Sequence, residues 1–383
     1  MVLRLLLRDC INEKQQPCWC RDMKTIPYAK HTIGKAEIKA VKVIMLGNNL
    51  TQGNTVARFE EVLCKYIGCE HAIAVSSGTA ALHIAMQAAK IKYNLKTIAT
   101  TALTFVAVAN AIEAAGIKII TRDIHPTTYL MQNNNQAENI IDMHYAGFPN
   151  TIITKSILME DAAHSFGASR LLEEWEKVGC NKQYKALLTC FSFHPSKTIT
   201  TGEGGCICTN DGDIDFLCRC LRDNGRATIG KALVRGSNYR MTDIAAAIGI
   251  EQIKKTDEFI ARRRWVARQY YMHLEKINDI QLPSYNNPEK ERSAWHLFVI
   301  KSNIGNGLRI LFELQNKGIM ARTHYMPLWL HPRYDNLQVQ PITNTIWQDL
   351  ITLPIYPTIK KEQIRFVCRQ LIDILNNIKG GNK

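Results

Sequence analysis

Residues 71–101 read HAIAVSSGTAALHIAMQAAKIKYNLKTIATT, and this stretch decides the fold. The short apolar run His71–Val75 is followed by a helical pattern over Thr79–Ala89 and by a second short run, Thr97–Thr101. Short apolar runs separated by a helical pattern indicate a strand, a crossover helix and a parallel strand. This unit therefore predicts a mainly parallel α/β sheet.

The same alternation continues on both sides of this unit. Val56–Ile67 has apolar residues at helical spacing and ends at Gly68, a plausible C-terminal stop, and Phe105–Ala115 is a further predicted helix. The other predicted strands are Ile117–Thr121, Asn139–His144, Ser156–Met159, Leu187–Phe193 and Gly205–Thr209. With the first two, they make a sheet of seven strands with flanking helices.

The remainder of the chain predicts a smaller C-terminal α/β domain. A long helical region runs from Thr242 to about Ile277, and the elements after it are strand, helix, strand and helix, over Ala294–Lys301, Gly307–Lys317, Ile319–His324 and Lys361–Ile378. We therefore divide the chain into an extension of uncertain order (1–25), a large domain (26–255) and a small domain (256–383). Met23 is a candidate natural start, because residues 1–22 lack the periodicity that follows.

The composition is that of a globular protein. Hydrophobic residues make up 46% and charged residues 21% of the 383, and no apolar run is long enough to cross a bilayer. Charges interrupt the apolar start before an export signal could form. The twelve cysteines are scattered and lack zinc-site spacing, so we expect reduced thiols, no metal and a cytoplasmic location.

The formal net charge of +14 is spread along the chain. For its densest cluster, Ala261–Trp265, we expect a solvated helix face, and steering of phosphorylated, carboxylated substrates is a second interpretation. We therefore rank nucleic-acid binding below the alternatives and expect neither a nucleic-acid nor a membrane partner.

Three segments at strand ends carry candidate chemistry. Val75–Ala81 joins a strand to a helix, so it is either a phosphate seat at a helix N-terminus or an ordinary turn capped by Ser77 or Thr79. Glu160–His164 places carboxylates and an imidazole after a strand, where one carboxylate either pairs with a protonated ring nitrogen of a ligand, caps a helix or forms a surface ion pair.

The third segment, FSFHPSKTITTGEGG over residues 191–205, is the most specific. A single lysine, Lys197, stands among hydroxyl side chains, a histidine and glycines just past an apolar strand. A lysine in such surroundings can lose its charge and act as a nucleophilic amine.

With these motifs the chain resembles the DegT/DnrJ/StrS family of sugar aminotransferases, within the fold-type I pyridoxal enzymes. The resemblance covers roughly residues 26–375 and rests on the ordered motifs 76–79, 160–164, 192–197, 201–205 and 238–243. Segments 26–28, 50–53, 144–147 and 324–327 are most similar to the branch that aminates a UDP-linked 4-keto-6-deoxy sugar on the pseudaminic acid pathway.

The resemblance implies roles for the catalytic positions. Lys197 would hold pyridoxal 5'-phosphate (PLP) as a Schiff base, and Asp161 would keep the pyridine nitrogen protonated. His164 would lie near the ring hydroxyl, and Phe105 would stack on the ring face.

The remaining implied roles concern binding. Gly78, Thr79 and Ser192 would bind the cofactor phosphate, with Asn238 reaching in from the second subunit of a homodimer. Tyr28 and His324 are candidate contacts for the sugar or nucleotide, and a core or loop role is an equal alternative for each.

The implied reaction is ping-pong transfer of an amino group from L-glutamate to the nucleotide-linked keto-sugar, with Lys197 as general base and acid. Related sugar dehydratases carry histidine at the position of Lys197, so transamination is preferred. Two alternatives stay open: amination of another substrate, such as a 3-keto, dTDP-linked or GDP-linked sugar or a keto-inositol, and a PLP-binding regulatory protein without turnover.

One segment departs from the family pattern. Only about a dozen residues separate Gly147 from Glu160, where relatives have a helix before the acidic motif. A crossover with its helix needs a dozen residues or more, so we expect no helix here and a less well covered outer face.

Overall fold

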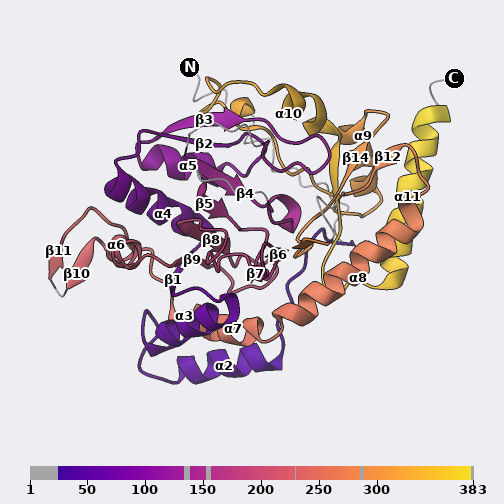
Figure 1. The fold of residues 1–383 in the computed structure, drawn as a ribbon. Coiled ribbons are helices and arrows are strands. Elements are labelled where there is room, and N and C mark those ends of the chain that lie inside the picture. The colour runs from indigo at the N-terminus through magenta and orange to yellow at the C-terminus, as the bar shows by residue number, and fades with distance from the viewer. Residues whose placement is uncertain (1–24, 133–138, 152–156, 229, 285–288, 381–383) are drawn as a thin grey trace, which may run out of the picture.

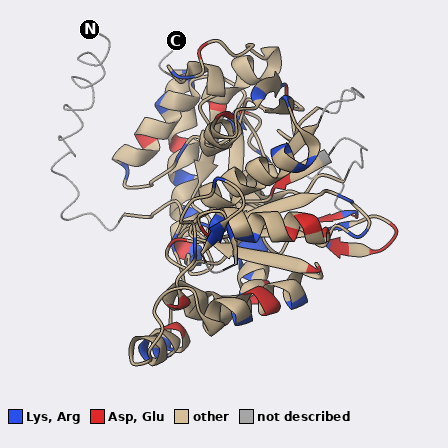
Figure 2. Cartoon of the chain, turned by 90° about the vertical axis from the view of Figure 1, so that its left-hand side faces the viewer, with Lys and Arg blue, Asp and Glu red and all other residues tan. Residues whose placement is uncertain are grey.

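The computed structural model describes residues 25–132, 139–151, 157–228, 230–284 and 289–380 (Figure 1). The predicted extension of residues 1–25 lies outside this part of the chain, apart from Thr25. Within the described ranges, no helix has the length and apolar character needed to cross a membrane. Figure 2 shows basic and acidic segments interspersed over helices and strands.

The centre of the molecule is a seven-stranded sheet with the order β1-β9-β8-β5-β4-β2-β3. Only β9 runs antiparallel to its neighbours, which confirms the predicted mainly parallel sheet. The strands are β1 (His71–Val75), β2 (Thr97–Thr101), β3 (Lys118–Arg122), β4 (Ile140–Met143), β5 (Ile157–Asp161), β8 (Leu188–Ser192) and β9 (Gly205–Thr209). Each overlaps a predicted strand, and β1, β2 and β9 have the predicted bounds.

Helices cover both faces of this sheet, because side chains alternate between the faces of a strand. On β1, Ile73 and Val75 join the apolar core beneath α4, α5 and α6, whereas Ala72 and Ala74 join the core formed with α3 and α7. The helices are α2 (Lys35–Met45), α3 (Asn54–Ile67), α4 (Gly78–Tyr93), α5 (Ala107–Ala114), α6 (Gly212–Arg222) and α7 (Asp243–Ile253). Of these, α2 and α6 were not predicted from the sequence.

The C-terminal part contains an antiparallel three-stranded sheet, β12-β14-β15, against which α8, α9 and α11 pack in a shared apolar core. Its elements are α8 (Thr256–Leu274), β12 (Ile280–Gln281), β14 (Phe298–Ser302), α9 (Gly307–Asn316), α10 (Pro341–Ile346), β15 (Leu350–Leu353) and α11 (Lys361–Gly380). The predicted helical region after Thr242 resolves into α7 and α8. The domain boundary at residues 255/256 stays a prediction.

The predicted strand Ile319–His324 is wrong. Ile319 and Arg322 make only isolated bridges, to Ile26 and Thr352. The position beside β14 is taken instead by β15, which was not predicted. An apolar run alone does not say which of two candidate segments pairs with a strand.

The connection from β4 to β5 contains one 3-10 turn, η3 (Tyr145–Gly147), and no α-helix among its described residues. It packs against the start of β14: the Gly147 carbonyl accepts from the Ala294 N–H, and that of Ala146 from the Leu297 N–H. The less well covered outer face expected beside this short connection stays a prediction. Two small sheets complete the fold, β13-β6-β7 (Glu291–Arg292, Ser169–Leu171, Trp175–Lys177) and β10-β11 (Arg226–Thr228, Lys231–Ala232).

Candidate active site

A cavity of about 400 Å³ lies where the carboxyl ends of β5 and β8 meet the N-terminus of α4. Ligands of open α/β sheets bind at this edge. Nine of the ten residues nominated from the sequence line the cavity: Tyr28, Gly78, Thr79, Phe105, Asp161, His164, Ser192, Lys197 and His324. The tenth, Asn238, does not.

Lys197 lies in a hydrogen-bonded turn after β8. Its N–H donates to the His194 carbonyl at 2.9 Å, and its own carbonyl accepts from the Arg263 guanidinium at 3.3 Å. Burial lowers the pKa of Lys197 to about 8, against the opposing effect of the Asp161 carboxylate. An amine with this pKa is partly unprotonated near neutrality and can act as a nucleophile.

Asp161 ends β5 and is 4% exposed. Burial raises the pKa of its carboxyl, although the Ala163 N–H, which donates to it at 3.1 Å, and the charges of Lys197 and His144 act in the opposite direction. A buried carboxylate of this kind gains from a cationic partner supplied by a ligand.

Glu160, the residue before Asp161, belongs to a separate buried network. Its carboxylate lies 2.6 Å from the Arg170 guanidinium and 3.2 Å from Nε2 of His144, and it accepts from the Thr189 hydroxyl at 2.7 Å. Burial acts to raise its pKa, but Arg170 and His144 outweigh this and lower the pKa to about 2. Glu160 is therefore a structural anion, outside the cavity.

His164 contributes an uncharged imidazole. Its Nε2 lies 2.7 Å from the Tyr325 hydroxyl, and its ring centroid lies 4.4 Å from that of His296. Burial lowers the pKa of His164 well below its usual value, and the nearby Lys197 charge acts in the same direction.

The N-terminus of α4 forms a tight cradle against the end of β8. Ser77 caps the helix by accepting from the Ala80 N–H at 3.0 Å. A Cβ on Gly78 would lie 2.7 Å from Cβ of Ser192, so only glycine permits this approach. Backbone N–H groups at a helix N-terminus, here beside the hydroxyls of Thr79 and Ser192, suit a phosphate.

Aromatic and imidazole side chains form the rest of the wall. Phe105 is 54% exposed, and its ring centroid lies 5.9 Å from that of Tyr325. Nδ1 of His324 lies 2.8 Å from the Thr352 hydroxyl, and burial lowers the pKa of His324 to about 3. The Tyr28 ring packs beside His324 at 5.9 Å.

Asn238 lies beyond α6, where it forms an isolated bridge with Asp223. It is not among the residues that line the cavity of its own chain. That Asn238 binds the cofactor phosphate in the active site of a second subunit stays a prediction.

The cavity residues that the sequence reasoning did not nominate include Tyr325 and His296. Tyr325 directly follows the nominated His324, and its place in the motif at 324–327 was an available signal. His296 lies just before β14 in an apolar context that contains no signal for a site. Nδ1 of His296 is buried without a hydrogen-bond partner among the described residues.

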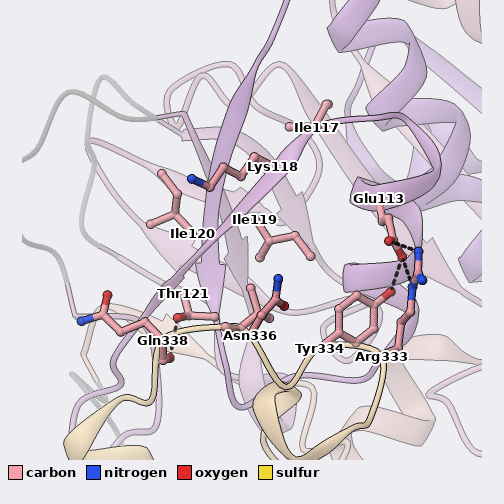
Figure 3. Close-up of a pocket in the computed structure, with 11 residues that line it drawn as sticks. Glu113, Ile117, Lys118, Ile119, Ile120, Thr121, Arg333, Tyr334, Asn336 and Gln338 are labelled. Atoms are coloured by element: carbon pink, nitrogen blue, oxygen red, sulfur yellow. Dashed lines mark hydrogen bonds and ion pairs between the residues drawn. The ribbon is translucent and has the colours of Figure 1, made fainter.

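A second cavity, of about 580 Å³, lies at the edge strand β3 (Figure 3). It shares no lining residue with the first. Its one acid, Glu113, is already paired with Arg333 and accepts from the Tyr334 hydroxyl (Figure 3). Across the described ranges, no group of His, Cys, Asp or Glu is arranged to hold a metal ion.

The first cavity fits the cofactor that the sequence resemblance implies. It combines Lys197, whose pKa is lowered, with the buried carboxylate of Asp161. It also contains the N-terminus of α4, where only glycine fits at position 78, and the exposed ring of Phe105. In the same order, these groups suit the aldehyde, the pyridine nitrogen, the phosphate and the ring face of PLP.

Comparison with known proteins agrees with this chemistry. A profile of the DegT/DnrJ/EryC1/StrS aminotransferase family matches residues 31–372. The chain is 31% identical over 387 residues to a UDP-4-amino-4,6-dideoxy-N-acetyl-beta-L-altrosamine transaminase of Campylobacter jejuni, covering 93% of this chain and 99% of that protein. An uncharacterised Methanocaldococcus jannaschii protein is also 31% identical, with 92% and 97% covered.

Solved structures share the fold. Helicobacter pylori PseC, an aminotransferase of pseudaminic acid biosynthesis, superposes with a TM-score of 0.82 at 25% identity and covers 91% of this chain and 99% of its own. The PLP form of a putative sugar aminotransferase of Streptococcus pneumoniae superposes with a TM-score of 0.80 at 22% identity, covering 91% and 97%.

Proposed function

The chain belongs to the DegT/DnrJ/EryC1/StrS family of PLP-dependent sugar aminotransferases, and on this premise we propose that it aminates a UDP-linked 4-keto-6-deoxy sugar with L-glutamate as donor. The observation that carries the proposal is the convergence of Lys197, Asp161 and the α4 N-terminus on one cavity. The named relatives in C. jejuni and H. pylori support the choice of substrate.

The side chains divide the chemistry between them. When bound, PLP supplies an electron sink and carries the amino group between two half-reactions. Lys197 would hold the cofactor through Nζ, and its free amine, with a pKa of about 8, would serve as the base and acid that moves a proton at the reacting carbon. Asp161 would hold the pyridine nitrogen protonated, and His164 would hydrogen-bond the ring hydroxyl.

Binding groups surround this centre. Thr79, Ser192 and the α4 N-terminus would hold the phosphate, and Phe105 would lie against the ring. Uncharged His324 and Tyr28 contact the sugar or nucleotide. Asn238 completes the phosphate site of a second subunit, so the active form is a homodimer.

We place the reaction in the cytoplasm. Nine cysteines within the described ranges are free thiols, among them the neighbouring Cys206 and Cys208, whose sulfurs lie 3.9 Å apart. Thiols persist in reducing compartments.

The test separates this proposal from its two alternatives. Purified protein with PLP is mixed with glutamate, and the absorbance of the cofactor is followed as it becomes pyridoxamine phosphate. The nucleotide-linked keto-sugars and a keto-inositol are then added in turn and the products analysed. A cofactor band that glutamate does not change would support the regulatory protein, and amination of a different sugar would change the substrate.

Lys197→Ala tests the covalent attachment. We expect the variant to fold, to lose cofactor trapping by borohydride and to lose transamination, because alanine provides no amine. Lys254→Ala, which removes a surface lysine paired with Glu251, is the matched control and should be trapped as wild type. Normal turnover by the Lys197 variant would refute the mechanism.

A further inference from the structure

Tyr325 and His164 meet inside the candidate site, although the proposed reaction assigns no role to Tyr325. The Tyr325 hydroxyl lies 2.7 Å from Nε2 of His164, and the two rings are stacked at 5.9 Å. The other ring nitrogen, Nδ1, is buried without a hydrogen-bond partner among the described residues. A neutral imidazole has one N–H and one bare nitrogen, so this contact decides which nitrogen carries the proton.

The direction of the hydrogen bond follows from the acidity of the two groups. Burial raises the pKa of Tyr325 well above its usual value, and the Asp161 charge adds to this, so the phenol keeps its proton. The lowered pKa of His164 keeps its ring uncharged. A phenol is a stronger donor than a neutral imidazole N–H, and a bare imidazole nitrogen is a stronger acceptor than a phenol oxygen. Tyr325 therefore donates to Nε2, and the proton of His164 lies on Nδ1.

The His164 ring is also prevented from exchanging its nitrogens. His296 packs 4.4 Å from it by ring centroids, at an interplanar angle of 48°. Both imidazoles are 3% exposed. A ring flip would need space that the packed His296 ring occupies.

We propose that Tyr325 is a positioning residue that fixes His164 as its Nδ1–H tautomer, so that Nδ1 presents a donor to the ring hydroxyl oxygen of PLP. The second half of this statement rests on the proposed function, since it needs PLP in the cavity. The first half concerns the protein alone.

The tautomer is measured first, in protein without cofactor. Solid-state NMR of protein labelled with ¹⁵N-histidine separates protonated from bare ring nitrogens. The signals of His164 are identified as those that His164→Gln removes. We expect Nδ1–H in the wild type and a mixture of tautomers in Tyr325→Phe. Tyr28→Phe, which removes the hydroxyl of a ring that packs beside His324 and not beside His164, should leave the tautomer unchanged. Nε2–H in the wild type, or one unchanged tautomer in Tyr325→Phe, would overturn the inference.

Cofactor affinity is measured second, by titrating apoprotein with PLP. Loss of one oriented hydrogen bond should weaken binding by Tyr325→Phe about tenfold. His164→Gln provides an amide donor that needs no tautomer, so adding Tyr325→Phe to it should cost no further affinity. An equal loss in both backgrounds would contradict a role through His164. Protein that never binds PLP would refute the proposed function, yet the NMR result would still decide the role of Tyr325.

Discussion

Glu160 and Asp161 are neighbours on β5, yet the pKa values of their carboxyl groups are shifted in opposite directions. The pKa of Glu160 is lowered to about 2, because Arg170 and His144 outweigh burial, whereas burial raises the pKa of Asp161. Alternation along the strand sends one side chain into a closed polar network and the other into the cavity. Glu160 is already paired with the Arg170 guanidinium and is structural. Asp161, whose pKa burial raises, lines the cavity and can pair with a cation of a ligand.

The largest expected effect comes from removing the cation of the closed network. Arg170→Met should lower the free energy of unfolding by about 3–5 kcal/mol, because it leaves Glu160 buried without its guanidinium partner. The measurement is urea unfolding at pH 7. Replacing Glu160 by Met in the same protein should restore most of the loss, and Arg333→Met, at an exposed pair with Glu113, should change little. An unaffected Arg170 variant would show that the ion pair does not hold Glu160.

The second effect is the pH dependence of stability. With a folded pKa of about 2 against an ordinary 4.5, Glu160 contributes about 3 kcal/mol above pH 4.5, and this is lost as the pH falls towards 2. The advantage of wild type over Glu160→Gln should therefore shrink over that range. A constant difference between pH 5 and 2 would contradict it.

The contribution of Asp161 to the pH dependence of stability has the opposite sign to that of Glu160. A raised folded pKa means that the charged carboxylate destabilises the fold once the pH exceeds its unfolded value of 3.8. Asp161→Asn should therefore be at least as stable as wild type at pH 7, by the same urea measurement, while transamination falls roughly 10²-fold or more through loss of ring protonation. A variant of normal activity would remove Asp161 from its role.

The smallest effect concerns the link between Asp161 and Lys197. The Asp161 charge raises the pKa of Lys197 against burial, so in Asp161→Asn that pKa should lie below the wild-type value of about 8. The rate at which apoprotein captures PLP should rise with pH through this value, since the unprotonated amine is the nucleophile. The same midpoint in both proteins would show that the two side chains do not interact.

The sequence predicted the site better than its surroundings. The segments that contain Asp161 and Lys197 were singled out because both follow apolar strands, and parallel strands bring their carboxyl ends to one edge, whereas the choice of Asp161 came from the family resemblance. Arg170 was not connected with Glu160, because their contact depends on how the small sheet β13-β6-β7 folds back. The strand at Ile319–His324 failed for a similar reason, since β15 competes for the same place beside β14.

Local patterning by itself determined the alternating strands and helices, the glycine at the α4 N-terminus and the lysine after β8, because each depends on neighbours in the chain. Only the tertiary structure decided which carboxylate acquired an arginine, which imidazole met the Tyr325 hydroxyl and how far burial lowered the pKa of Lys197. These properties depend on solvent exclusion and on contacts between residues as far apart as His164 and Tyr325, and no local pattern encodes such contacts.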